Sequence, residues 1–199
     1  MAEEMSLRER KKAETRVALC RAAMRIVAEK GLDRLTVDAV AAEGGVSVRT
    51  FHNYFGSKEE AVFAMVSEVL HDVVQRFAAS PAEVGIWDAF RSAVLASVDE
   101  ARTQWADGLA MLRTLRAEPE QLAQQLAKVT AIHFAAVETV AARTGTDPKT
   151  DLYPHLLANA CGSVLDSAIA IWDGEPLEEF RDLLIDGVEQ MRAGLPQPV

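Results

Sequence analysis

The sequence predicts an all-α protein, and three observations lead to this fold class. Apolar residues recur at spacings of three and four positions along almost the whole chain of 199 residues, which is the period of an amphipathic helix. Alanine, leucine, arginine and glutamate, which all favour helix, dominate the composition. The glycines and prolines gather in a few clusters, where they would end helices rather than interrupt them.

The composition indicates what kind of all-α protein this is. With 49% hydrophobic and 26% charged residues, the chain resembles an ordinary globular protein with a sizeable core. No apolar run approaches the roughly 20 residues that a membrane span needs, and the charged start MAEEMSLRERKK is followed by no apolar signal core. We therefore expect a cytoplasmic protein with no membrane partner. Cys20 and Cys161 are expected to be packing residues rather than a redox pair.

The net charge of −9 is unevenly distributed along the chain. Residues 1–55 hold ten Lys and Arg against eight Asp and Glu, whereas the remainder holds 11 against 22. A nucleic acid could therefore bind at the N-terminal end, because the rest of the chain would repel a polyanion.

The first helices are marked by their end signals. A helix is expected over residues 7–30, and Gly31 would end it in a left-handed conformation. Thr36 is expected to cap a short helix over residues 37–43, which the pair Gly44-Gly45 ends.

Two more helices follow at once. Ser47 is expected to cap a third short helix that runs to Asn53 or Tyr54. Ser57 and Glu60 have the spacing of a capping box, which would open a longer helix towards Phe77.

Two short helices joined by a glycine-bearing turn are typical of the helix-turn-helix unit, whose second helix enters the DNA major groove. Phe51 and Phe55 are expected to point to the core. The other positions of this helix then carry groups suited to contacts with bases and phosphates. These are Val48, Arg49, Thr50, His52 and Asn53. The alternative is a turn of an ordinary α-protein whose polar residues are only solvated.

The segment TVDAVAAEGGVSVRTFHNYFGSKEEAV closely resembles the N-terminal signature of TetR-family transcriptional repressors, over roughly residues 8–77. The matching residues are Thr36-Val37, Ala41, Gly45-Val46-Ser47, Thr50, Tyr54-Phe55 and Ser57-Lys58-Glu59. Its part TFHNYFGSKEEAV is also similar to a subset of actinobacterial regulators that includes the mycofactocin-associated type, which senses acyl-CoA.

The resemblance implies a homodimer that binds double-stranded operator DNA and is released by a small-molecule effector. It implies a helix-turn-helix domain at residues 1–56, a connecting helix at 57–77, and a ligand-binding and dimerisation domain at 78–199. In this family the residues that match Thr36, Ser47, Thr50, Tyr54 and Lys58 usually hold phosphates. Those that match Val48, Arg49, His52 and Asn53 face bases. Arg49 and His52 replace the glycine and tyrosine that are common in the family, so the resemblance does not indicate an operator sequence.

The second half of the chain is expected to be helical throughout. Residues 80–83, Ser-Pro-Ala-Glu, have the pattern of a capping box, which would open a helix that continues to a break at Glu118-Pro119. A long helix would then end at Gly145.

The last two helices, residues 152–172 and 177–195, are expected to form the dimer interface. The first is apolar on most sides, and a helix that is apolar all round must be buried all round. The apolar face of the second contains Leu177, Phe180, Leu184, Val188 and Met191. The resemblance implies that both pack against their mates as a four-helix bundle. The alternative is that they complete the core of a monomer.

Several residues of the second half are candidates for contacts with an effector, which the apolar surroundings predict to be hydrophobic or amphipathic, such as an acyl-CoA, a lipid or an aromatic compound. The apolar candidates are Trp87, Phe90, Trp105, Met111 and Phe134. Such residues are core residues by default, but the family resemblance places a ligand pocket among these helices, so at least two of them are expected to line it. His133 is either a core histidine or an effector contact. Asn159, Ser163 and Asp166 lie on one stripe that contacts the effector, bonds across the dimer, or is simply exposed.

An enzyme is not expected, because no nucleotide-binding loop, metalloprotease or hydrolase motif is present. The four histidines lack the spacing of a helix-borne metal pair, and we expect no catalytic residue, metal or cofactor. The competing classes are a helical enzyme and a helical small-molecule-binding protein or adaptor that keeps the fold without regulatory DNA binding.

Overall fold

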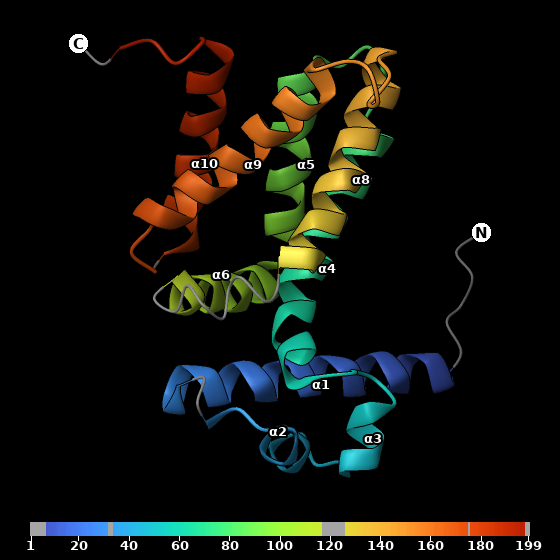
Figure 1. Cartoon of the computed structure of the whole chain (residues 1–199). Coiled ribbons are helices and arrows are strands. Elements are labelled where there is room, and N and C mark those ends of the chain that lie inside the picture. Colours follow the sequence, from blue (N-terminus) through green and yellow to red (C-terminus); the bar gives the residue numbers. More distant parts are fainter. Residues whose placement is uncertain (1–6, 32–33, 117–125, 175, 198–199) are drawn as a thin grey trace. The chain divides into compact units, whose positions relative to one another are not determined.

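All regular structure in the described part of the chain is helical. The computed structural model describes residues 7–31, 34–116, 126–174 and 176–197 (Figure 1). The chain divides into two compact units, Met1–Val66 and Ser67–Val199, and the boundary falls inside one continuous helix, α4 (Lys58–Ala79). No helix in the described ranges has the length and apolar character required to cross a bilayer.

The first unit contains α1 (Leu7–Lys30), α2 (Val37–Glu43), α3 (Val48–His52) and the first turns of α4. The four predicted helices are confirmed, although α3 ends at His52 rather than at Asn53 or Tyr54 and α4 continues past Phe77 to Ala79. Gly31 has a φ of 79° and its N–H donates to the carbonyl of Val27, so it ends α1 as expected. The core of this unit is formed by residues of all four helices and of the chain between α1 and α2. Its most buried large side chains are Leu19, Val27, Leu35, Val40, Phe51, Phe55, Val62 and Met65.

The turn between α2 and α3 needs its two glycines for different reasons. A Cβ atom at Gly44 would lie 2.7 Å from Cδ2 of Leu19 and 3.1 Å from the carbonyl oxygen of Val40, so the backbone approaches α1 too closely for a side chain. Gly45 has open space around it but a φ of 67°, which residues other than glycine rarely adopt. This turn brings α3 into contact with α2.

The helix caps of this unit are hydroxyl side chains. The Thr36 hydroxyl oxygen accepts from the N–H of Ala39 at the start of α2, and the Ser57 hydroxyl oxygen accepts from the N–H of Glu60 at the start of α4. The Glu60 carboxylate in turn accepts from the N–H of Gly56 at 2.8 Å. The reciprocal capping pattern predicted from the sequence is therefore present, with the return bond on Gly56.

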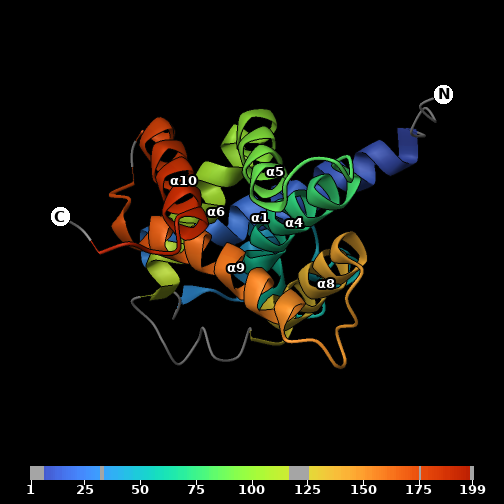
Figure 2. The same cartoon turned by 90° about the horizontal axis from the view of Figure 1, so that it is seen from above.

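The second unit contains the rest of α4 together with α5 (Ile86–Glu100), α6 (Arg102–Arg116), α8 (Leu126–Thr144), α9 (Tyr153–Ile171) and α10 (Leu177–Arg192). Figure 2 shows α9 between α8 and α10, and α9 packs against both. The core draws on all six helices. Its members include Val73, Phe77, Phe90, Val94, Trp105, Leu109, Val140, Leu157, Phe180 and Leu184.

Two predictions for the start of this unit were wrong. Residues 80–83 are not a capping box, because the Ser80 hydroxyl donates back to the carbonyl of Arg76 and α5 begins only at Ile86. The single helix expected beyond it is broken at Ala101, which has φ −119° and ψ 39°. The break lets the indole N–H of Trp105 donate to the hydroxyl of Ser97, a side chain with no exposed surface. The break expected at Glu118-Pro119 lies outside the described residues.

The predicted surface of α10 also needs correction. The apolar face of α10 packs into the core of its own protomer, where Leu184 and Val188 are buried. By contrast, Tyr153, Leu156 and Ile171 of α9 each expose half or more of their surface in the single protomer, so the burial predicted for this helix would need a second copy and stays a prediction. Helix α10 ends at Arg192 rather than at Leu195.

Candidate nucleic-acid interface

Helix α3 is fixed by its aromatic residues. Phe51 has no exposed surface, and its ring lies 5.7 Å from that of Phe55 and 5.5 Å, edge to face, from the His52 imidazole. The guanidinium of Arg16, on α1, lies over the Phe55 ring at 4.7 Å. The two phenylalanines therefore hold a five-residue helix, too short to be stable by itself, against the core.

The residues predicted to face bases are exposed on α3. Val48, Arg49, His52 and Asn53 are all exposed. The position of Val48 is the most informative, because a valine with 39% of its surface in water contributes little to the core. A small apolar group beside hydrogen-bonding side chains is suited to the base edges of the major groove.

Two residues predicted to hold phosphates are engaged in capping. The Ser47 hydroxyl oxygen accepts from the N–H of Thr50 at 3.1 Å and shares a second hydrogen bond with the Thr50 hydroxyl. Thr36 caps α2 in the same way. Both residues remain exposed, so their hydroxyl groups are within reach of an external acceptor.

Lys58 lies at the start of α4, and its ammonium is hydrogen-bonded within the first unit. Its ammonium donates to the carbonyl oxygen of Leu35 at 2.8 Å and lies 3.8 Å from the carboxylate of Glu59. An ammonium has three donors, so contact with a phosphate remains compatible with this bond. Removal of Lys58 would also loosen the chain between α1 and α2, which the sequence did not indicate.

A groove of about 710 Å³ lies between α1 and α3. From α3 and the residues after it, Thr50, Asn53 and Tyr54 line the groove. The α1 side is formed by Arg8, Lys11, Lys12 and Thr15. Sequence reasoning missed the α1 residues as a site, although their spacing of three, four and seven positions puts them on one helix face. The spacing of these basic residues is visible in the sequence, but it had been used only to estimate the net charge of the N-terminal end.

The residues predicted to contact an effector differ in their exposure, and their role stays a prediction. Phe90 and Trp105 are buried core residues, and Trp87 is half-buried with its ring 6.5 Å from that of Phe90. His133 is half-buried beside Phe134, whose side chain is 59% exposed. The side chain of Met111 lies outside the described part of the structure.

The polar stripe of α9 faces away from the core. Asn159, Ser163 and Asp166 are all exposed in the protomer. This removes the need for a buried partner that the sequence raised for Asp166, and it leaves effector contact and bonding across a dimer untested.

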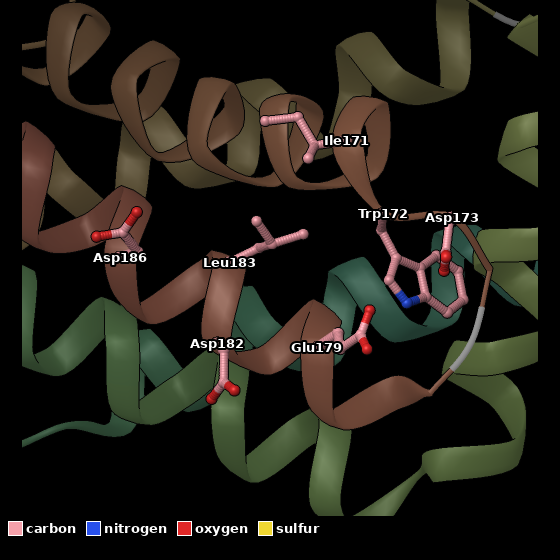
Figure 3. A pocket seen from close by; sticks show the side chains of 7 residues that line it. All are labelled: Ile171, Trp172, Asp173, Glu179, Asp182, Leu183 and Asp186. Carbon is pink, nitrogen blue, oxygen red and sulfur yellow. The ribbon is translucent and has the colours of Figure 1, made fainter. Parts of the chain in front are cut away.

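An open pocket of about 440 Å³ lies between the end of α9 and α10 (Figure 3). Its apolar part is formed by Ile171, Trp172 and Leu183, and the side chain of Leu183 points towards α9. Four carboxylates surround it, from Asp173, Glu179, Asp182 and Asp186. None of the predicted effector contacts lines this pocket.

Neither cysteine of the chain forms a disulfide. Cys20 and Cys161 are free thiols, and burial raises the pKa of Cys161 to about 12, which leaves its thiol protonated and unreactive. No group of three His, Cys, Asp or Glu residues in these ranges is arranged to hold a metal ion.

The fold and the site together define a class of protein. A helix-turn-helix unit with exposed hydrogen-bonding side chains shares a continuous helix with a larger helical unit, as in DNA-binding transcriptional regulators. Comparison of the sequence with known protein families identifies the family. Residues 19–65 match the family model described as bacterial regulatory proteins, tetR family, and residues 84–196 match the model described as MftR C-terminal domain. The chain belongs to the TetR family of ligand-responsive, DNA-binding transcriptional regulators, which are not enzymes.

The chain is also similar to individual transcriptional regulators. The HTH-type transcriptional regulator TcmR of Streptomyces glaucescens is 30% identical over 158 residues, which cover 76% of this chain and 70% of TcmR. Among solved structures, Salmonella enterica GusR aligns with a TM-score of 0.65 at 20% identity, over 92% of this chain and 95% of GusR. The fatty acid degradation regulator FadR from Bacillus halodurans aligns with a TM-score of 0.62 at 16% identity, over 92% and 97%. At these identities the two structures support the fold alone.

Proposed function

We propose that the chain is a transcriptional repressor that binds operator DNA as a homodimer through α2 and α3, and that a small hydrophobic or amphipathic effector releases it. The observation that carries this proposal is the composition of one surface of the first unit. There, Arg49 and His52 are exposed next to a groove lined by three basic residues of α1. Groups that read base edges and groups that neutralise phosphates thus lie side by side. As a DNA-binding regulator, it would act in the cytoplasm.

The homodimer is supported by the outward face of α9. Leu156 and Ile171 on this helix, with Tyr153 at its start, are exposed large apolar side chains. Between them, the exposed residues of the same side are small or polar, among them Ser163 and Ala170. A second copy of the chain that packed against this side would remove the apolar groups from water without crowding. The sequence suggested an interface formed by both of the last two helices, and the proposal keeps the α9 face because Leu184 and Val188 of α10 lie in the core of their own protomer.

The effector is proposed to bind in the second unit. The aromatic and imidazole residues Trp87, Phe90, His133 and Phe134 would contribute apolar contacts, and Asn159 and Asp166 would contribute polar ones. An acyl-CoA, a lipid or an aromatic compound would suit these groups. Helix α4 belongs to both units, so a change in its tilt on effector binding would alter the distance between the two α3 helices of a dimer. These must reach successive major grooves about 34–36 Å apart.

A gel shift with the DNA upstream of the chain's own gene tests this function. We expect a discrete complex that survives competition by random-sequence DNA. A thermal-shift and native mass spectrometry screen of acyl-CoAs, fatty acids and aromatic compounds would then identify an effector. By linkage, that compound and the operator must weaken each other's binding by the same factor. A hit that binds equally well with and without operator would contradict the release mechanism. A chain that binds no DNA would instead be a small-molecule-binding protein or adaptor.

A further inference from the structure

We propose that the groove between α1 and α3 is a track for one strand of the DNA phosphate backbone, and that Asn53 binds this backbone rather than a base edge. This inference rests on the proposed DNA binding and adds to it which residues hold the backbone and which read the sequence. It departs from the role of Asn53 that the sequence suggested.

The charge of the groove comes from α1. Arg8, Lys11 and Lys12 lie at i, i+3 and i+4, so their side chains project from one face of the helix. Two other arginines of the helix have acidic partners, since Arg10 pairs with Glu14 and Arg25 with Glu43. Within the described ranges no ion pair involves Arg8, Lys11 or Lys12. These three cations are therefore available to an external anion.

The opposite wall of the groove is neutral and rich in hydrogen-bonding groups. Thr50, Asn53 and Tyr54 lie at i, i+3 and i+4. The Asn53 side chain is exposed and carries two N–H donors, and the Tyr54 hydroxyl is a third donor. Cations on one side and neutral donors on the other are the combination that binds phosphate oxygens without reading sequence. A volume of about 710 Å³ accommodates a stretch of backbone rather than a single ion.

The same geometry divides the surface of α3 in two. Thr50, Asn53 and Tyr54 face the groove, whereas Val48, Arg49 and His52 do not line it. Once the groove side holds a strand of the backbone, the residues outside it remain for base edges. Sequence readout is therefore assigned to Val48, Arg49 and His52.

Salt dependence separates these roles, because each neutralised phosphate contributes about 0.9 to the slope of log K against log salt on duplex DNA. We would measure the binding of the full chain by fluorescence anisotropy between 50 and 200 mM KCl. One labelled duplex would be the upstream fragment and the other a 30-base-pair duplex of random sequence. Lys11→Ala and Lys12→Ala should each lower the slope by about one unit on both duplexes. Across this fourfold range of salt that is about a fourfold smaller loss of affinity per lysine.

The matched control is Arg10→Ala, which removes the same charge from the same helix but at a position outside the groove. It should leave the slope unchanged. Asn53→Ala should weaken binding to both duplexes by the same factor, whereas Arg49→Ala should weaken the upstream fragment more than the random duplex. Circular dichroism and the thermal midpoint would show that each variant is folded.

Two results would overturn the inference. One is a wild-type slope for both lysine variants, or a slope lowered equally by Arg10→Ala. The other is a loss of preference for the upstream fragment in Asn53→Ala, which would place this side chain on a base. A wild-type chain that binds both duplexes equally well contradicts the repressor but leaves the track standing, because backbone contacts are independent of sequence. A chain that binds neither duplex at 50 mM KCl contradicts both.

Discussion

Arg143 donates from Nη1 to the carbonyl oxygen of Ser80 at 2.6 Å. Its other contacts extend this bond along the chain between α4 and α5, since Nη2 donates to the carbonyls of Pro81 and Val84 and the guanidinium lies over the ring of Phe77. The carbonyls beyond the end of a helix have no partner within it. One side chain of α8 thus donates hydrogen bonds to several backbone carbonyls of the segment between α4 and α5.

Replacement of Arg143 by methionine should lower the free energy of unfolding by about 2–4 kcal/mol, because four carbonyls, those of Phe77, Ser80, Pro81 and Val84, lose a charged donor. Arg143→Lys should fall between wild type and Arg143→Met, since an ammonium cannot span all four acceptors. Urea unfolding followed by circular dichroism would measure both. The control is Arg102→Met, which breaks an exposed ion pair with Glu178 and should change little. Equal losses in Arg143→Met and Arg102→Met would contradict this account.

Acid should destabilise the second unit through Asp72 and Glu100. Burial by itself would raise the pKa of Asp72, but hydrogen bonds from Arg76 and Ser97 outweigh it and lower the pKa below the usual 3.8. The hydrogen bond from Arg76 likewise lowers the pKa of Glu100 from 4.5. A carboxyl with a lowered pKa in the folded state stabilises the fold above its unfolded pKa, and this contribution is lost as the pH falls through the folded value.

The urea midpoint should therefore be insensitive to these groups between pH 7 and about 5, and should fall below about pH 4. Arg76→Met removes the shared partner of both carboxylates. It should lower the midpoint at pH 7 and make the further fall towards pH 3 shallower than in wild type. An unchanged difference between the two pH values would mean that Arg76 does not hold these carboxylates.

Leu156→Glu should convert the dimer to a monomer, because a carboxylate on the outward face of α9 would be buried without a partner in the interface. Sedimentation velocity would measure the change. The residue is 57% exposed in the protomer, so the fold itself should tolerate the substitution. Lys149→Glu, at an exposed position in the loop before α9, is the control and should remain dimeric. A wild-type monomer, or a dimeric Leu156→Glu variant, would place the interface elsewhere.

Arg49→Ala should change the sequence preference of the protein, with a loss of about 1–3 kcal/mol at the base pair that Arg49 contacts. Lys58→Ala should weaken all sequences alike, and it should also lower the stability of the first unit because the bond to the carbonyl of Leu35 is lost. Footprinting on a set of single-base variants of the upstream fragment would distinguish the two. If both variants protect the same bases as wild type with equal affinity, α3 is not the recognition helix.

The first unit could be predicted almost residue by residue because its signals are local. Thr36, Ser47 and Ser57 cap the helices that follow them, and Gly31 and Gly45 adopt the left-handed conformation that their positions suggested. Hydrophobic spacing then identified Phe51 and Phe55 as core residues. Each of these inferences needs only a few neighbouring residues.

The second unit was harder because its interactions join distant parts of the chain. The break at Ala101 goes with a hydrogen bond between Ser97 and Trp105 that a regular helix pattern conceals. The bonds from Arg143 to Ser80 and Pro81 span more than 60 residues. Spacing showed that α10 has one apolar face, but it could not show whether that face meets its own protomer or a second one. The predicted domain limits and the effector residues remain predictions.

The continuity of α4 across the boundary between Val66 and Ser67 has a consequence for any exchange of parts between regulators. A flexible linker would tolerate insertions, but a helix advances by about 100° and 1.5 Å for every residue. One extra residue at this junction would rotate everything after it by more than a quarter turn relative to the helix-turn-helix. Seven extra residues would nearly restore the phase. A hybrid regulator with a new DNA-binding unit must therefore be joined in helical phase, and the amino-acid count of the junction matters more than its composition.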